Sequence, residues 1–179
     1  MPRSADEAQK SVLNLLIMEK HAAIIDLDPH SDASLRLLDA SDTYLGSLYP
    51  PESNHLTSPV ELAKPHVRFL GYLEGSEVIG CCASKVLTDD EGLYGEIKRL
   101  FVLPEYRGRG ISKVLMGAIE NHLIDQGICR IRLEAGIYQP EALGLYRRLG
   151  YVERGPYGDY APDPLSVFME KKLRSLSAS

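Results

Sequence analysis

Residues 107–112 have the sequence RGRGIS and combine two glycines with two arginines directly before an amphipathic run. If a helix begins there, its first N–H groups lack internal partners and carry partial positive charge. Gly108 and Gly110 would leave room for an anion to approach those amides. Over residues 96–113, five basic residues oppose two acidic ones, within a chain of net charge −5. The stretch indicates an anion-binding site, while its composition alone also fits a turn with solvated arginines.

The common nucleotide-binding motifs do not fit this stretch. A P-loop requires Gly-Lys followed by Ser or Thr, and a dinucleotide fingerprint requires a third glycine where Lys113 stands. The acidic net charge argues against a protein that coats nucleic acid. The three cysteines give no disulfide framework or metal-ligand spacing, and no apolar run is long enough to span a membrane. We therefore expect no nucleic acid, membrane or metal as partners, and the reducing cytoplasm as the compartment.

The sequence around this stretch alternates between strand and helix patterns, as in a single α/β domain of ordinary size. Short alternating or β-branched runs predict strands over residues 22–28, 67–73, 77–87, 94–103, 128–135, 151–155 and 166–173. Apolar residues at helical spacing predict helices over residues 32–49, 58–65, 110–126 and 140–150. We expect residues 1–20 to be an extension with a partial helical pattern, residues 21–174 to be the domain, and residues 175–179 to be a flexible tail.

Alternation also assigns side chains to the faces of two predicted strands. In the strand over residues 94–103, one face is expected to carry Glu96, Lys98, Leu100 and Val102. In the strand over residues 128–135, Cys129, Ile131 and Leu133 are expected inside, with Arg130, Arg132 and Glu134 pointing away.

Two segments together carry a family resemblance. The string RLFVLPEYRGRGISKVLMGAIENHL, followed after a strand by QPEALGLYRRLGYVERG, resembles the GCN5-related N-acetyltransferase (GNAT) superfamily, in particular its small bacterial members. In the family's first segment, Arg107 and Gly110 fill fixed positions, and Ser112 stands where glycine or alanine is usual. The second segment is matched by Ala142, Tyr146, Gly150 and Tyr151, with Gln139 in place of a frequent asparagine.

The resemblance implies an α/β (α+β) fold with a mixed, mostly antiparallel sheet of about six to seven strands flanked by helices. This sheet would splay between the strand ending at Leu103 and the strand starting at Ile128. The implied co-substrate is acetyl-CoA, with no metal, and its pantetheine arm would pair with free strand amides as in β-augmentation. The residues expected to bind it are Phe101, Val102, Leu103, Arg107, Gly108, Arg109, Gly110, Ile111, Ser112, Gln139 and Tyr146.

Acyl transfer from a thioester to an amine requires a proton acceptor for the amine and benefits from a proton donor to the leaving sulfur. Tyr146 matches the family's tyrosine and is our candidate donor, the alternative being a packing role in the apolar stripe of its helix. Glu96 stands at the strand position of the catalytic glutamate in the histone-acetylating branch and is the candidate base. The alternative for Glu96 is a solvated carboxylate paired with Lys98 or Arg99.

The loops YPPESNHLTSP and GPYGDYAPDPLS are those that usually border the acceptor pocket in this fold. They offer Glu52, Asn54, His55 and Asp159 as candidate substrate-binding residues, although such residues beside proline are also ordinary in turns. The predicted function is acetyl transfer to a small-molecule amine, such as an amino acid, a polyamine-like metabolite or an amine-bearing antibiotic, in a ternary complex. Protein N-terminal or lysine acetylation and a non-catalytic acyl-CoA sensor are the alternatives. The resemblance also implies that a homodimer is common in such proteins.

Overall fold

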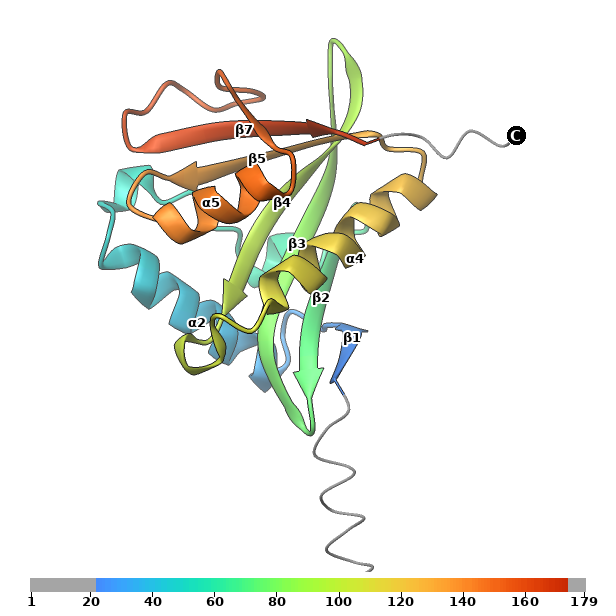
Figure 1. Ribbon diagram of the computed structural model, residues 1–179, viewed down its shortest axis with the longest axis vertical. Helices are drawn as coiled ribbons and strands as arrows, with labels where there is room; N and C mark the ends of the chain where they lie inside the picture. Colours follow the sequence, from blue (N-terminus) through green and yellow to red (C-terminus); the bar gives the residue numbers. More distant parts are fainter. Residues whose placement is uncertain (1–21, 174–179) are drawn as a thin grey trace, which may run out of the picture.

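Seven strands form one sheet in the order β1-β2-β3-β4-β5-β7-β6 (Figure 1). The computed structural model describes residues 22–173. The strands are β1 (Ala22–Asp26), β2 (Val67–Glu74), β3 (Glu77–Asp89), β4 (Gly92–Val102), β5 (Arg130–Gly136), β6 (Val152–Arg154) and β7 (Ser166–Lys172). All neighbouring strands pair antiparallel except β4 and β5, which are parallel. This confirms the mixed, mostly antiparallel α/β sheet that was predicted.

Helices cover both faces of the sheet. They are α2 (Asp32–Gly46), α3 (Pro59–Leu62), α4 (Ile111–Asp125) and α5 (Pro140–Arg148), with short 3-10 turns at Pro51–Ser53 and Pro104–Tyr106. Leu123 of α4 lies directly over Gly95 of β4, whereas Tyr44 of α2 packs against Phe101. The helix predicted over residues 32–49 ends earlier, at Gly46, and Tyr49 instead begins the loop toward α3.

The β3–β4 pairing contains a bulge that changes which side chains of β4 share a face. Lys98 is opposite Ala83 and Phe101 is opposite Cys81, so two residues of β4 lie opposite Cys82 alone. One of these two, Arg99, has a positive φ of 56°. Because alternation shifts by one residue at the bulge, Glu96 and Lys98 share a face with Phe101 and not with Val102. The prediction that Glu96 and Val102 point the same way is therefore wrong.

The parallel pair β4–β5 is short, and beyond it the two strands separate. Pairing covers only Gly95–Ile97 against Ile131–Leu133. The next residues along the two strands are Lys98 and Glu134, which flank the start of the split. The sheet therefore splays as predicted, and the edge of β4 from Lys98 onward has no strand beside it.

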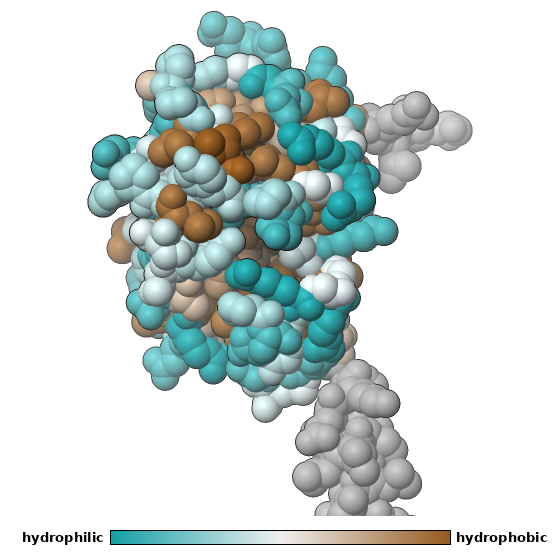
Figure 2. All heavy atoms as spheres, turned by 60° about the vertical axis from the view of Figure 1, so that its left-hand side comes forward, coloured by the Kyte–Doolittle hydropathy of each residue, from teal (hydrophilic) through white to brown (hydrophobic). Residues whose placement is uncertain are grey.

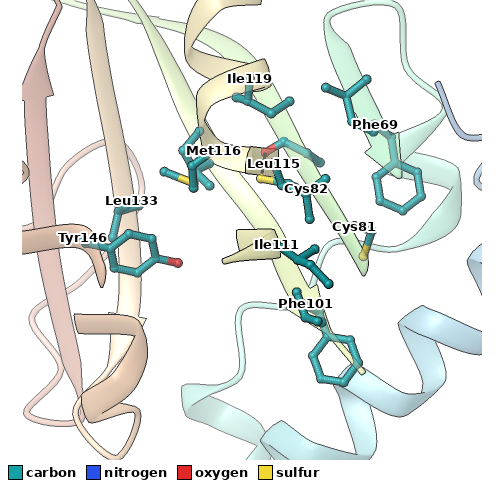
Figure 3. Packing of buried hydrophobic residues seen from close by; sticks show 14 of the residues in the cluster. Phe69, Cys81, Cys82, Phe101, Ile111, Leu115, Met116, Ile119, Leu133 and Tyr146 are labelled. Carbon is teal, nitrogen blue, oxygen red and sulfur yellow. Dashed lines mark hydrogen bonds between the residues drawn. The ribbon is translucent and has the colours of Figure 1, made fainter. Parts of the chain in front are cut away.

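The buried core lies on both faces of β3, β4 and β5, where Cys81, Cys82, Leu115 and Met116 are completely buried (Figure 3). Arg132 points away from Ile131 and Leu133, as predicted, but it is only 1% exposed. Asp89 and Glu170 bind its guanidinium, which also lies 4.3 Å from the centroid of the Tyr94 ring. Cys129, expected inside, is partly exposed because it precedes β5.

Residues 22–173 contain neither a membrane-spanning helix nor a cluster of metal-binding side chains. A helix that crosses a membrane would need a longer apolar stretch than any helix within residues 22–173 offers. Within the same residues, no three His, Cys, Asp or Glu side chains come together as a metal site would require. The helix predicted within residues 1–20 lies outside the described residues.

Candidate active site

The loop before α4 presents backbone amides to an open space. Gly110 is the N-cap of α4, has a φ of 79°, and provides no side chain to cap the helix. Gly108 has a φ of 77°, and a methyl group built on either glycine would meet no atom within 4 Å. The first turn of α4 therefore carries partial positive charge that faces free space.

The two arginines of the loop lie in different directions. The Nε of Arg107 donates to the carbonyl oxygen of Val102 (3.0 Å), and its guanidinium lies 4.8 Å from the centroid of the Tyr44 ring. Arg109 instead binds Glu74 of β2 through Nη1 at 3.0 Å. The structure thus holds Arg107 at the open space and pairs Arg109 with a carboxylate outside it.

A cavity of about 430 Å³ runs from this loop along the end of β4 to α5. Eight of the residues predicted to bind the cofactor line it: Phe101, Val102, Arg107, Gly108, Gly110, Ile111, Ser112 and Gln139. Arg109 does not line it, and neither does Leu103, whose N–H donates to the carbonyl oxygen of Ile79 (3.0 Å). Leu103 and Arg109, which were expected to bind the cofactor, thus lie outside the lining of this cavity, and their role in binding stays a prediction.

A second cavity, of about 110 Å³, adjoins the first at the split between β4 and β5. Leu100, Gln139 and Ala142 line both cavities. Figure 2 turns the side that carries α2 and α5 forward and shows apolar atoms in a recess between polar rims. The two cavities together form one cleft. We call the cavity of about 430 Å³ the cofactor cavity and the cavity of about 110 Å³ the acceptor cavity.

Tyr146 projects from α5 into the acceptor cavity and is 6% exposed. Figure 3 shows its ring beside Leu133, with the hydroxyl directed away from α5. No hydrogen bond within residues 22–173 involves this hydroxyl, so it is available to a ligand. Burial raises the pKa of Tyr146 well above its ordinary value, and the phenol is therefore protonated at neutral pH.

Glu96 lies next to the acceptor cavity but does not line it. Its carboxylate accepts hydrogen bonds from the hydroxyls of Tyr157 (3.1 Å) and Tyr160 (2.7 Å), and it is 4% exposed. Lys98 Nζ in turn donates to the Tyr160 hydroxyl (2.8 Å). Glu96 reaches the cavity only through these side chains, so the expected direct position in the cleft is not found.

The acceptor cavity contains charged residues that were not among the predicted site residues. Lys98, Arg99 and Glu134 line it, together with the predicted Asn54 and His55. Arg99 is held by Asp42 of α2 and donates to the carbonyl oxygen of Thr57 (2.8 Å). Strand alternation alone placed Glu134 away from the core, and only the position of the split shows that this direction leads into a cavity.

Of the four predicted substrate-binding residues, two line the acceptor cavity and two lie outside it. Asn54 and His55 line the acceptor cavity; Asn54 Nδ2 donates to the carbonyl oxygen of Tyr49 (3.3 Å), and the His55 ring packs edge-on against Tyr160. Glu52 and Asp159 are exposed and line neither cavity. Their loops turn these two side chains toward solvent, so their part in substrate binding stays a prediction.

A splayed α/β sheet with an uncapped helix N-terminus at one end of the split and a polar cavity at the other is the architecture of acyl-CoA-dependent acyltransferases. The family model described as "Acetyltransferase (GNAT) family" matches residues 35–151, and the chain belongs to this family of N-acetyltransferases. The family uses acetyl-CoA as acyl donor.

Known proteins of similar sequence and structure agree with this assignment. The chain is 48% identical over 145 residues to a protein of Azospirillum brasilense named "IAA acetyltransferase", covering 81% of this chain and 94% of the relative. It is 33% identical to a candidate acyl-CoA N-acyltransferase from Klebsiella pneumoniae, with a TM-score of 0.69, covering 86% of this chain and 98% of that one. The PaiA N-acetyltransferase of Thermoplasma acidophilum, solved in complex with coenzyme A, shares the fold at 21% identity and a TM-score of 0.66, over 85% of this chain and 99% of that one.

Proposed function

We propose that the protein transfers the acetyl group of acetyl-CoA to the primary amine of a small molecule by direct attack within a ternary complex. The observation that carries this proposal is the continuity of the cofactor and acceptor cavities across the split in the sheet. Tyr146 lies on α5, which lines both cavities, so a group of one substrate can meet a group of the other beside its hydroxyl. Such positioning supplies much of the rate acceleration in two-substrate reactions.

The residues of the cofactor cavity suit the chemistry of acetyl-CoA. The pyrophosphate would bind the amides of Gly108 to Ser112 at the start of α4, where no side chain fills the space. Arg107 adds a positive charge at the same end of the cavity. The pantetheine arm would lie along the unpaired edge of β4, where free backbone groups can pair with its amides.

The reaction forms a C–N bond as the amine attacks the thioester carbonyl carbon, and the electron pair of the breaking C–S bond leaves with the sulfur. Of the two protons that the ammonium loses, one ends on the sulfur and one is released to solvent. Tyr146 would donate to the sulfur, since its raised pKa keeps the phenol protonated. Glu134 is the carboxylate that lines the acceptor cavity, and it takes the role of proton acceptor better than the enclosed Glu96.

A small acceptor is supported by the dimensions of the acceptor cavity, which has a volume of only about 110 Å³.

The described cysteines are all unpaired, and adjacent thiols such as Cys81 and Cys82 fit a reducing compartment, which supports the cytoplasm as the site of the reaction.

The proposal is tested by release of free thiol from acetyl-CoA in the presence of a panel of amines. We expect turnover with at least one small amine, and a fall in kcat of about 100-fold or more in Tyr146→Phe, because positioned proton donors contribute at least that much. The matched control is Tyr138→Phe, which removes the hydroxyl of a half-exposed tyrosine that lines neither cavity.

Three other results would count against the proposal. Tight coenzyme A binding without turnover on any amine would indicate a sensor of acyl-CoA. Turnover with peptides but not with small amines would indicate a protein acetyltransferase. Equal rates in the wild type and Tyr146→Phe would remove the assigned role of Tyr146.

A further inference from the structure

Lys98 is a partly buried cation that lines the acceptor cavity without a carboxylate partner. Its Nζ donates one hydrogen bond, to Tyr160, and forms no ion pair with any residue of the described range 22–173. An ammonium group has three donors, so two remain for a ligand. Desolvation lowers the pKa of Lys98, as expected for a cation whose charge is incompletely compensated.

The negative charge that balances Lys98 lies behind it, on the side away from the cavity. Tyr160 accepts a hydrogen bond from Lys98 and donates one to Glu96, and Tyr157 donates to the same carboxylate. This arrangement fixes the direction of the ammonium group and keeps Glu96 out of direct contact with it. The remaining donors of Lys98 therefore face the cavity.

Glu134 is the complementary group across the split. Its Oε1 accepts a hydrogen bond from the hydroxyl of Ser166 (2.6 Å), and no cation within residues 22–173 forms an ion pair with it. Glu96 is opposite Arg132 and Ile97 is opposite Leu133, so Lys98 and Glu134 are the first unpaired residues on the two separating strands and share a face. A positive and a negative group thus line one small cavity without touching each other.

We propose, building on the acetyltransferase function above, that the acceptor is an amino-acid-like zwitterion whose carboxylate binds Lys98 and whose amine is held by Glu134. A ligand with both charges satisfies both residues, whereas a simple amine leaves the two remaining donors of Lys98 without an acceptor. Buried charged groups that lose their partner cost considerable free energy, so this pairing discriminates against acceptors that lack the carboxylate.

The test compares each of the twenty standard amino acids with its own α-carboxamide, which keeps the amine and removes the negative charge. Thiol release gives kcat/KM for each member of a pair. For at least one pair, we expect wild-type kcat/KM to be about 10- to 100-fold higher for the amino acid than for its amide, the range of a hydrogen bond to a charged group. In Lys98→Met, this ratio should fall to about one, as expected when the charged partner is removed.

The matched control is Lys85→Met, because Lys85 lies on the adjacent strand opposite Glu96 and lines neither cavity. This variant should keep the wild-type ratio. An equal loss of activity on acids and amides in Lys98→Met would mean that Lys98 only supports Tyr160 and Glu96. Amides that react as well as the acids in the wild type would overturn the proposal.

Calorimetry separates this inference from the proposed function. The amino acids are titrated into the protein saturated with coenzyme A, which carries no acetyl group, so binding is measured without reaction. Heat of binding that is lost in Lys98→Met and kept in Lys85→Met supports the zwitterion site even if no amine is acetylated. If no amino acid gives either heat of binding or turnover, the zwitterion site is contradicted. This holds even if other amines are acetylated.

Discussion

The hydroxyls of Tyr146, Tyr157 and Tyr160 show how one residue type acquires different uses from its surroundings. Nine further tyrosines occur in the chain, and Tyr157 and Tyr160 are already engaged by Glu96. Tyr146 is buried against the core yet keeps an unengaged hydroxyl at the cavity. Its proposed role as a proton donor therefore depends on a position at the boundary between core and cleft, and not on the tyrosine side chain alone.

His122 gives a prediction at the same scale, for stability and not for activity. Arg68 Nη1 lies 2.9 Å from its Nδ1, and Asp26 and Asp125 are the nearby carboxylates. Desolvation, followed by the charge of Arg68, lowers the pKa of His122 below its ordinary value near 6.5. The unfolded chain then binds the proton more strongly, so stability should fall as pH drops below about 6.5.

Urea unfolding at pH 7.5 and pH 5.5 measures this effect. His122→Gln, which can still accept from Arg68, should lose less free energy of unfolding between the two pH values than the wild type. His30→Gln is the control, since His30 is an exposed histidine on the loop before α2. An identical pH dependence in the wild type and His122→Gln would contradict the argument.

At the scale of elements, the proposed anion site is formed by the backbone at the start of α4, and Gly110→Asp tests this. The substitution puts a carboxylate at amides that carry partial positive charge, so coenzyme A should bind about tenfold or more weakly. The left-handed conformation of Gly110, with φ 79°, also costs the variant about 1–2 kcal/mol of stability.

Gly75→Asp separates these two effects. Gly75 lies in the β2–β3 turn, has a φ of 61° and has equally open space around it. It should show the same loss of stability in thermal unfolding but normal coenzyme A affinity in calorimetry. Equal affinity for both variants would mean that the loop before α4 does not bind the pyrophosphate.

The elements also show where the sequence was informative. The start of α4 was predictable because its causes are local: glycines and the change from strand to helix periodicity around Gly110. The bulge at Arg99 was not, because it depends on how β4 pairs with the preceding strand β3, and the alternation of residues within β4 does not show that register. That single shift put Val102 on the face opposite to Glu96 and Lys98, and Phe101 on the same face as these two residues. Exposure of Glu52 and Asp159 likewise depends on loop conformations that proline and polar residues do not define.

Across the whole molecule, the split sheet combines a continuous core with an open ligand site. The core cluster extends over α4, β3, β4 and β5, and Arg132 bridges β5 to β7 and to the β3–β4 end through Glu170 and Asp89. These contacts lie at the end where β4 and β5 pair, so they hold the two halves of the sheet together there. From Lys98 and Glu134 onward the two strands stay apart. The cleft is therefore built into the folded sheet and needs no movement of strands to form.

The adjacent cysteines of β3 make this architecture accessible to chemical labelling. Cys81 shares the face of Phe101 and Cys82 points to the opposite face, and both are fully buried. Burial raises the pKa of Cys81 to about 12, and burial also raises the pKa of Cys82 well above its ordinary value. Neither thiol therefore reacts with an alkylating reagent unless its layer of the protein opens. Two neighbouring residues thus report separately on the α2 layer and the α4 layer.

Because one core cluster surrounds both thiols, we expect them to be alkylated at the same rate, and mass spectrometry of labelled peptides measures this. The partly exposed Cys129 should react first and serves as the internal reference. Faster labelling of Cys81 would instead reveal that α2, which forms one wall of the cleft, detaches independently of the rest. The same chemistry bears on any assay that follows thiol release, where Cys129→Ser removes the protein's own background signal.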